Sequence, residues 1–302
     1  MNEPIAAERC GAALVVLLLA AAARADVTEV TTAAYPEGPA WVGGQLYYVE
    51  YAGSGVKRWD GQAAHALWSK DKCGASGLIE FAHDHLLVAC YDSNSVIEID
   101  RGGHELRTFD RDDAGHPFAG PNDFAPDGHG GVYLSASGVY DLKAPITGTV
   151  LHLSADGKHL VELANTIHYS NGLTLTADGK TLLVAEMLAA RILAFPVNAD
   201  GSLGPRRVWA RLQDLAAPTP NADAYNGPDG LKLGPDGLYY IAQNGSGRVL
   251  VVDEAPHLIR TIEVRAPFVT NMAFGPDGAV FVTGVFDQWN PPYPGMVFRW
   301  TR

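Results

Sequence analysis

The sequence predicts an all-β protein, a six-bladed β-propeller whose ring is closed by an N-terminal strand. A short phrase recurs six times along the 302 residues: a polar residue, usually a Gly, an apolar residue, a turn such as PDG or ADG, and an apolar run. Further β-rich runs follow each phrase, and no helical periodicity persists for long. Four short antiparallel strands repeated about every 40–50 residues are typical of propeller blades. A β-sandwich is the alternative architecture, but it does not explain a sixfold register.

Each unit supplies its strands in the same order. The second strands follow the phrase across a tight turn, as in a hairpin, and read QLYYVEY, HLLVACY, GVYLSAS, TLLVAEM, LYYIAQN and AVFVTGV. The third strands read VKRWD, VIEID, VLHLS, RILAFPV, RVLVVD and MVFRW. The fourth read HALWS, ELRTF, HLVEL, RVWAR and LIRTIEV, so the sixth unit lacks one. We expect the segment 26–32 to supply this outer strand and close the ring, which removes open sheet edges.

Residues 1–25 are predicted to be a signal peptide and not part of the fold. Residues 12–23 are apolar, and Ala23-Arg24-Ala25 reads as an A-x-A cleavage site. We therefore expect export to the periplasm or the medium, with residues 26–302 forming one domain and no membrane anchor after leader removal. A net charge of −12 argues against nucleic acid and anionic membranes as partners. We expect a monomer.

Two cysteines remain after the leader, Cys73 and Cys90. In the predicted register, Cys73 lies just before an innermost strand and Cys90 lies late in the strand that follows, so both lie at one rim. An oxidising compartment allows a disulfide there. Two small buried thiols are the alternative.

One residue holds the same place in every phrase, and all six are oxygen donors: Glu37, Ser76, Asn122, Asn171, Asp229 and Asn271. The first strand of each blade lines the central channel, so we expect these residues to form a ring at one mouth. Hard cations prefer oxygen ligands. We predict a Ca²⁺ site formed by Glu37, Asn122, Asn171 and Asp229, with Mg²⁺, Mn²⁺ or Zn²⁺ as alternatives, although no His/Cys cluster has zinc spacing. The alternative explanation is that Asn and Asp before Gly are common turn formers.

The loops between second and third strands are expected at the same mouth as the ring. They carry four candidate substrate contacts, and the two aromatic ones predict an apolar wall for a small ligand: Glu186, Asn244, Trp289 and Tyr293. Packing of the last loop on a neighbouring blade is the alternative.

Three more candidate contacts belong to the phrases themselves. Asn271 is a ring member, and Asp123 follows Asn122 and is expected to support the metal ligands from behind. His168 lies three residues before Asn171. It is either a proton shuttle or an ordinary rim histidine.

Five phrases resemble the SMP-30/gluconolactonase/luciferin-regenerating family: PEGPAW, GPNDFAPDG, SNGLTLTADGKTLLVAEM with RILAF, GPDGLKLGPDGLYYIAQNGSGRVLVVD, and VTNMAFGPDG. The resemblance covers residues 35–302 and implies a six-bladed propeller with a divalent ion, usually calcium, at the channel mouth. The family's ligand pattern falls on Glu37, Asn122, Asn171 and Asp229. The resemblance implies hydrolysis of sugar or other lactones, with related members acting on aryl esters and organophosphates. This chain has no arginine placed for a sugar-acid carboxylate.

The sequence therefore predicts a metal-dependent hydrolase that opens a lactone, gluconolactone-like or other. The ion would polarise the carbonyl, and Asp229 would serve as a ligand and as base or nucleophile. One alternative is an arylesterase or phosphotriesterase on the same site. Another is a propeller that binds a ligand without catalysis, although burying two ring carboxylates without a cation is costly. No G-x-S-x-G nucleophile elbow is present, which argues against a serine hydrolase.

Overall fold

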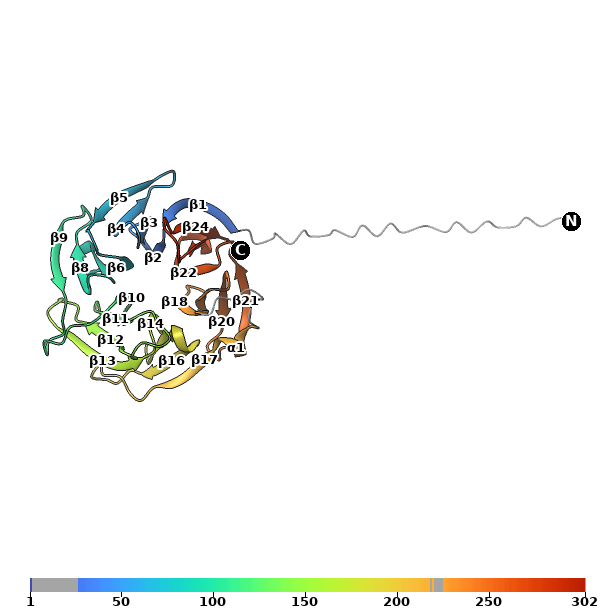
Figure 1. Cartoon of the computed structure of the whole chain (residues 1–302). Helices are drawn as coiled ribbons and strands as arrows, with labels where there is room; N and C mark the ends of the chain where they lie inside the picture. Colours follow the sequence, from blue (N-terminus) through green and yellow to red (C-terminus); the bar gives the residue numbers. More distant parts are fainter. Residues whose placement is uncertain (2–26, 218, 220–224, 302) are drawn as a thin grey trace.

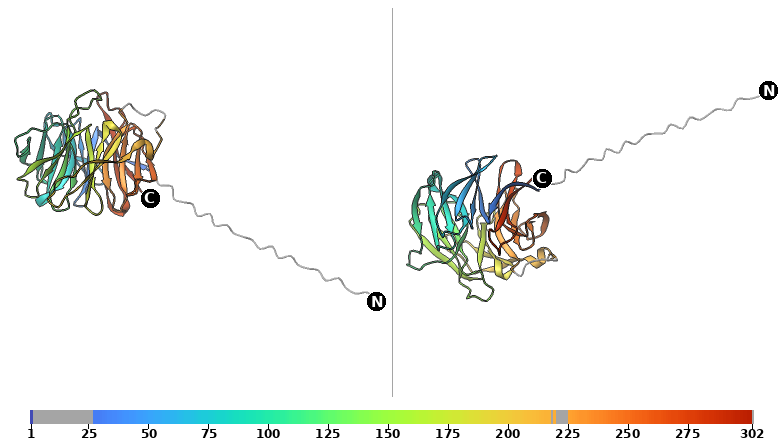
Figure 2. Two further views of the ribbon diagram at one scale, coloured as in Figure 1. Left: turned by 90° about the horizontal axis from the view of Figure 1, so that it is seen from below. Right: turned by 45° about the horizontal axis from the view of Figure 1, so that its top comes forward.

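The chain forms a ring of six four-stranded antiparallel blades around a central channel. The structure is a computed structural model that describes Met1 and residues 27–217, 219 and 225–301. Figure 1 looks along the channel, and Figure 2 shows the ring from two other directions. The predicted all-β propeller is confirmed. The predicted leader, residues 1–25, lies outside the described residues except for Met1.

Blades 1 to 4 are separate sheets whose strands pair in chain order. Blade 1 contains β2 (Pro36–Val42), β3 (Gln45–Glu50), β4 (Gly55–Trp59) and β5 (Ala64–Ser69). Blade 2 contains β6 (Ala75–Phe81), β7 (His85–Cys90), β8 (Ser95–Ile99) and β9 (Glu105–Phe109). Blade 3 contains β10 (Pro121–Pro126), β11 (Val132–Ala136), β12 (Gly148–Leu153) and β13 (Leu160–Ile167). Blade 4 contains β14 (Ser170–Leu175), β15 (Thr181–Glu186), β16 (Arg191–Pro196) and β17 (Arg207–Arg211).

Blades 5 and 6 complete the ring and are joined to each other by one backbone pair, Asn244 with Phe268. Blade 5 contains β18 (Gly227–Leu233), β19 (Tyr239–Asn244), β20 (Arg248–Val252) and β21 (Leu258–Glu263). Blade 6 contains β22 (Phe268–Phe274), β23 (Val280–Val285) and β24 (Pro294–Trp300), with β1 (Val27–Ala34) as its outer strand. β1 runs antiparallel to β24, with Val27 opposite Trp300. The predicted closure by the N-terminal strand is therefore confirmed (Figure 1).

The apolar core is divided among the interfaces between neighbouring blades. The described residues form six buried clusters, one at each interface. At the closing interface, for example, Leu46 and Tyr48 of blade 1 pack with Phe281 and Val297 of blade 6. Because each blade buries both faces, its middle strands are apolar almost throughout, and each fully buried large side chain contributes about 1.5–3 kcal/mol.

The inner strands approach one another closely around the channel, which explains the Gly that follows four of the six ring residues. A Cβ on Gly38 would lie 2.7 Å from the Cα of Gly77 on the next blade. A Cβ on Gly230 would collide with Asn271, again on the next blade. Only glycine permits this backbone approach, and the approach brings the ring residues of successive blades together.

The connections add short elements that periodicity did not predict. The insertion before blade 5 begins with a helical turn, α1 (Leu212–Leu215), and three 3-10 turns are η1 (Ala82–Asp84), η2 (Met187–Ala189) and η3 (Pro276–Gly278). Within residues 27–217 and 225–301, no helix has the length and apolar character to cross a membrane. Cys73 and Cys90 are joined in a disulfide with a Cα–Cα distance of 4.5 Å, at the rim where the register placed them.

Candidate functional site at the channel mouth

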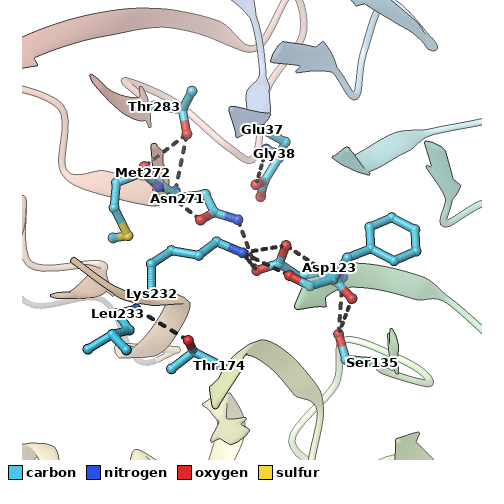
Figure 3. A network of polar contacts seen from close by, with 11 residues as sticks. Glu37, Gly38, Asp123, Ser135, Thr174, Lys232, Leu233, Asn271, Met272 and Thr283 are labelled. Carbon is cyan, nitrogen blue, oxygen red and sulfur yellow. Dashed lines mark hydrogen bonds and ion pairs between the residues drawn. The ribbon is translucent and has the colours of Figure 1, made fainter. Parts of the chain in front are cut away.

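All six ring residues are buried at the same mouth of the channel. Each lies near the beginning of its blade's first strand, on β2, β6, β10, β14, β18 and β22. Each first strand contacts the first strands of both neighbouring blades. The sixfold register therefore brings together the residues that the sequence singled out, and Figure 3 shows part of this polar centre.

Glu37 and Asp229 are two buried acids of the ring, and the charge of Asp229 acts on Glu37. Burial raises the pKa of Glu37 well above its usual range, and the Asp229 carboxylate raises it further. Burial also raises the pKa of Asp229, although a 2.9 Å hydrogen bond from Asn244 Nδ2 to its Oδ2 opposes the rise. Two carboxylates forced together out of water favour a proton or a metal ion between them.

Two amide oxygens beside these acids have unused acceptor capacity. Asn171 Oδ1 and Asn244 Oδ1 are buried, and neither has a hydrogen-bond partner among the described residues. The Asn171 amide also interacts with the Asp229 carboxylate. A buried polar atom without a partner is costly, and carboxylates with orphaned amide oxygens are the donor chemistry of a hard cation. The residues present therefore fit a divalent ion. No group of three or more His, Cys, Asp and Glu within the described chain suits a metal, so a zinc-type cluster is not seen there.

Asp123 is also buried but is neutralised by the protein itself. Lys232 Nζ donates to both of its oxygens, at 2.9 and 2.8 Å, and to the Phe124 carbonyl at 3.1 Å. Asn271 Nδ2 adds a 3.2 Å hydrogen bond to Asp123 Oδ2 (Figure 3). Asp123 and Asn271, predicted as substrate contacts, thus form a network with Lys232. The ring residue Asn271 thus supports Asp123, and the predicted contacts of both with substrate stay predictions.

A cavity of about 230 Å³ opens above Glu37, Ser76 and Asn122. The predicted contacts Trp289 and Tyr293 line it. The other lining residues were not predicted and are mostly tyrosines: Tyr35, Tyr51, Tyr91, Tyr140, Tyr169 and Gln288.

A repeat signal could have revealed part of this lining. Tyr35 and Tyr169 each precede a ring residue by two positions, and Tyr51 and Tyr91 each follow a second strand directly. Tyr140 and Gln288 have no such signal, because they lie in long loops of blades 3 and 6 that match no other unit.

His168 and Glu186 do not line this cavity. Glu186 is bound by Arg191 Nε at 2.5 Å and accepts the backbone N–H of His168 at 2.9 Å. His168 Nε2 is buried, and it has no hydrogen-bond partner in the described part of the chain. Both residues therefore brace the loop that ends β15, and their predicted contacts with substrate stay predictions.

The sequence matches the SMP-30/Gluconolactonase/LRE-like region over residues 35–285. The chain belongs to this family. The match covers all six ring positions and supports the resemblance seen in the repeated phrases.

Individual relatives are distant. Lactonase drp35 of Staphylococcus aureus is 29% identical over 142 residues, which are 47% of this chain and 41% of that protein. The chain thus spans less than half the length of that relative. Among solved structures, a gluconolactonase from Xanthomonas campestris superposes with a TM-score of 0.73 at 22% identity, covering 91% of this chain and 90% of that chain. Regucalcin, a calcium-binding protein from Agrobacterium tumefaciens, superposes with a TM-score of 0.69 at 20% identity, covering 90% and 92%.

Proposed function

We propose that the chain is a hydrolase that uses a divalent cation to open the ring of a small lactone. Ca²⁺ is the preferred candidate for this cation. The observation that carries the proposal is the pair of buried acids, Glu37 and Asp229, beside amide oxygens that lack partners. Membership of a family that contains lactonases and gluconolactonases supports the reaction class. The calcium-binding relative supports the choice of ion.

The proposed ligands are Glu37, Asn122, Asn171 and Asp229. When bound, the cation supplies Lewis-acid polarisation of the lactone carbonyl. In this proposal Asp229 accepts the proton of the attacking water, and the hydrogen bond from Asn244 Nδ2 to one of its oxygens holds the carboxylate in position. The proton is then returned to the ring oxygen as the acyl–oxygen bond breaks, which leaves a hydroxy acid. Ser76 has a structural role in this proposal, since its hydroxyl donates to the Pro121 carbonyl at 2.8 Å.

The test is turnover of δ-valerolactone and δ-gluconolactone by the purified protein, after chelation and again with Ca²⁺ restored. The proposal expects activity that disappears on chelation and returns with the ion. Turnover that persists without a metal would reject the cation's role. No turnover under either condition would reject the lactonase.

Aryl ester hydrolysis at the same site is the second candidate function, because aromatic side chains dominate the cavity wall. Phenyl acetate, run beside the lactones with and without Ca²⁺, distinguishes the two: a preference for the open-chain ester favours the esterase.

We also propose export, on the basis of the predicted leader and of a disulfide, which persists in oxidising compartments. Fractionation of the source cells tests it, since export predicts the protein outside the cytoplasm. Recovery of the protein with the cytoplasmic fraction would reject export.

A further inference from the structure

Eight aromatic side chains form a continuous belt over the candidate site. In this aromatic belt, neighbouring ring centroids lie 4.8–6.3 Å apart. Its members are Tyr35, Tyr51, Tyr91, Tyr140, Tyr169, Tyr225, Trp289 and Tyr293. All except Tyr225 line the cavity. A substrate must therefore pass aromatic surface to reach the ring of oxygen donors.

Tyr140 and Trp289 join opposite sides of the propeller. Tyr140 belongs to the loop after β11 in blade 3, and Trp289 belongs to the loop after β23 in blade 6. Their rings are nearly parallel, with a 20° interplanar angle and centroids 6.3 Å apart. The indole is 49% exposed. Two aromatic side chains from opposite blades thus offer their surfaces above the channel mouth, where a flat ligand can contact both.

The repeat shows that two of the tyrosines are kept at a conformational cost. The residue two positions before the ring residue has a left-handed backbone in the first four units. In units 2 and 3 it is glycine, Gly74 with φ +58° and Gly120 with φ +62°. In units 1 and 4 it is Tyr35 with φ +53° and Tyr169 with φ +66°. A left-handed residue with a side chain costs about 1–2 kcal/mol. Glycine is compatible with the fold at this position, so the presence of the two tyrosines is explained by the contacts that their rings make.

Three of the hydroxyl groups in the belt donate hydrogen bonds within the protein. Tyr51 Oη donates to Asp92 at 2.8 Å, and Tyr91 Oη donates to the Gly138 carbonyl at 2.7 Å. Tyr35 Oη donates to Gln288 Oε1 at 3.4 Å. These three tyrosines present hydrocarbon surface to the cavity, and their hydroxyl protons are engaged within the protein and not available to a polyol. Gln288 Nε2 is one exception, being a buried donor that lacks a partner among the described residues.

The wall also lacks positive charge. No Lys, Arg or His occurs among the described residues that line the cavity, while Glu37 contributes a carboxylate. An anionic substrate such as a sugar acid finds no positively charged side chain in this wall. At about 230 Å³ the cavity is small, since ligand pockets typically run from about 300 to 1,000 Å³.

We infer that the aromatic belt selects a compact, uncharged lactone fused to or carrying an aromatic ring, in preference to a polyhydroxylated sugar lactone. The lactone carbonyl lies at the oxygen donors, and the aromatic ring lies against Tyr140 and Trp289. This inference rests on the proposed hydrolase, whose substrate class it names.

Three six-membered lactones that differ in the groups fused to or carried by the lactone ring test the inference. These are 3-isochromanone, which carries a fused benzene ring, δ-valerolactone, which is unsubstituted, and δ-gluconolactone. 3-Isochromanone releases a benzylic alcohol and not a phenol, so a preference for it does not reflect a phenol leaving group. We expect the highest kcat/KM for 3-isochromanone and the lowest for δ-gluconolactone. A preference for δ-gluconolactone overturns the inference.

Variants of Trp289 connect the preference to the belt. Trp289→Leu is expected to lower the ratio of kcat/KM for 3-isochromanone over δ-valerolactone by about tenfold, since an aromatic contact is worth about 0.5–1.5 kcal/mol beyond its area. Trp289→Phe should keep most of the ratio. The control is Val139→Ala, an exposed neighbour of Tyr140 that does not line the cavity. An unchanged ratio in Trp289→Leu contradicts the inference.

Binding of the matching lactams separates this inference from the proposed reaction. 1,4-Dihydro-3(2H)-isoquinolinone and δ-valerolactam place an amide where the lactones place an ester, and calorimetry measures them without turnover. Tighter binding of the aromatic lactam that weakens in Trp289→Leu supports the belt even if no lactone is hydrolysed, in which case only the reaction is rejected. Equal binding of the two lactams rejects the belt's selectivity.

Discussion

Two buried acidic regions lie along one channel, and they differ in how their charge is balanced. Asp123 is held by the Lys232 ammonium and by Asn271, so the protein supplies its own cation. Glu37 and Asp229 receive hydrogen bonds from Gly38 and Asn244 but no ion pair from the described residues. The charge of the first region is balanced within the folded protein. The second region has negative charge and amide oxygens without partners, which an added cation would neutralise and bind.

The difference separates structural from chemical carboxylates. A buried ion pair whose hydrogen bonds are all made has a structural role, because removing one partner leaves the other as a buried charge without compensation. A buried acid pair without a cation has a raised pKa and can bind a proton or a metal ion. Asp229 is a ring residue and Asp123 directly follows one, and the position of Lys232 beside Asp123 gives the two acids different charge balance.

The largest effect is expected from Asp229→Asn. The substitution removes the proposed base while keeping an oxygen donor, so kcat/KM for the preferred lactone should fall about 10²–10⁴-fold. Asp253→Asn, in an exposed turn at the outer side of blade 5, is the matched control and should change little. Wild-type turnover by Asp229→Asn would remove Asp229 from the chemistry.

Substitutions at the ion pair of Asp123 and Lys232 should change the stability of the protein. Lys232→Met leaves Asp123 buried without its cation and should lower the free energy of unfolding by about 3–5 kcal/mol. The double variant Asp123→Asn with Lys232→Met removes both charges and should recover much of the loss. Urea denaturation measures all three proteins. A single variant as stable as wild type would show that Lys232 does not balance Asp123.

The unbalanced region should make stabilisation by Ca²⁺ depend on pH. In the metal-free protein, the raised pKa values of Glu37 and Asp229 mean that the folded state binds more protons than the unfolded state. Stability contributed by these groups is therefore lost as pH rises above their unfolded pKa of about 4. Ca²⁺ bound as proposed would replace the protons, and it would stabilise the folded state by about 2.7 kcal/mol at a hundredfold excess over Kd.

The shift in Tm on adding Ca²⁺ should accordingly be larger at pH 7 than at pH 5, as measured by thermal denaturation. A shift that is equal at both pH values would contradict the assignment of these acids to the site. In Glu37→Gln the shift in Tm on adding Ca²⁺ should be smaller than in the wild-type protein at both pH values.

The smallest effect is expected from Asn244→Ala. Its Nδ2 holds Asp229 Oδ2, and a hydrogen bond to a charged group is worth about 1.5–3 kcal/mol, so kcat should fall at least about tenfold. A lower kcat with unchanged KM and unchanged Ca²⁺ affinity identifies Asn244 as a residue that positions the Asp229 carboxylate. Loss of Ca²⁺ binding instead would make Asn244 a ligand.

The sequence predicted the features that the repeat determines. Glu37, Asn122, Asn171 and Asp229 occupy equivalent strand positions, so counting residues was enough to place them at one mouth. The closing strand followed from a unit that lacked its fourth strand. These predictions needed only the period of the chain.

Features that depend on side-chain reach or on unique loops were not predictable in this way. Lys232 bonds to Asp123 from 109 residues away across the channel, and no spacing encodes that contact. Glu186 pairs with Arg191 five residues later, a contact that the repeat does not indicate. Tyr140 and Trp289 meet because two long loops from opposite blades converge, which is a property of the closed ring and not of any single unit.

Titration of the deionised protein with Ca²⁺ in a calorimeter tests the central claim most directly. The unbalanced acid pair predicts one Ca²⁺ bound per chain, with binding lost or strongly weakened in Glu37→Gln and retained in the Asp253→Asn control. Absence of Ca²⁺ binding to the wild-type protein, or undiminished binding in Glu37→Gln, would contradict the account.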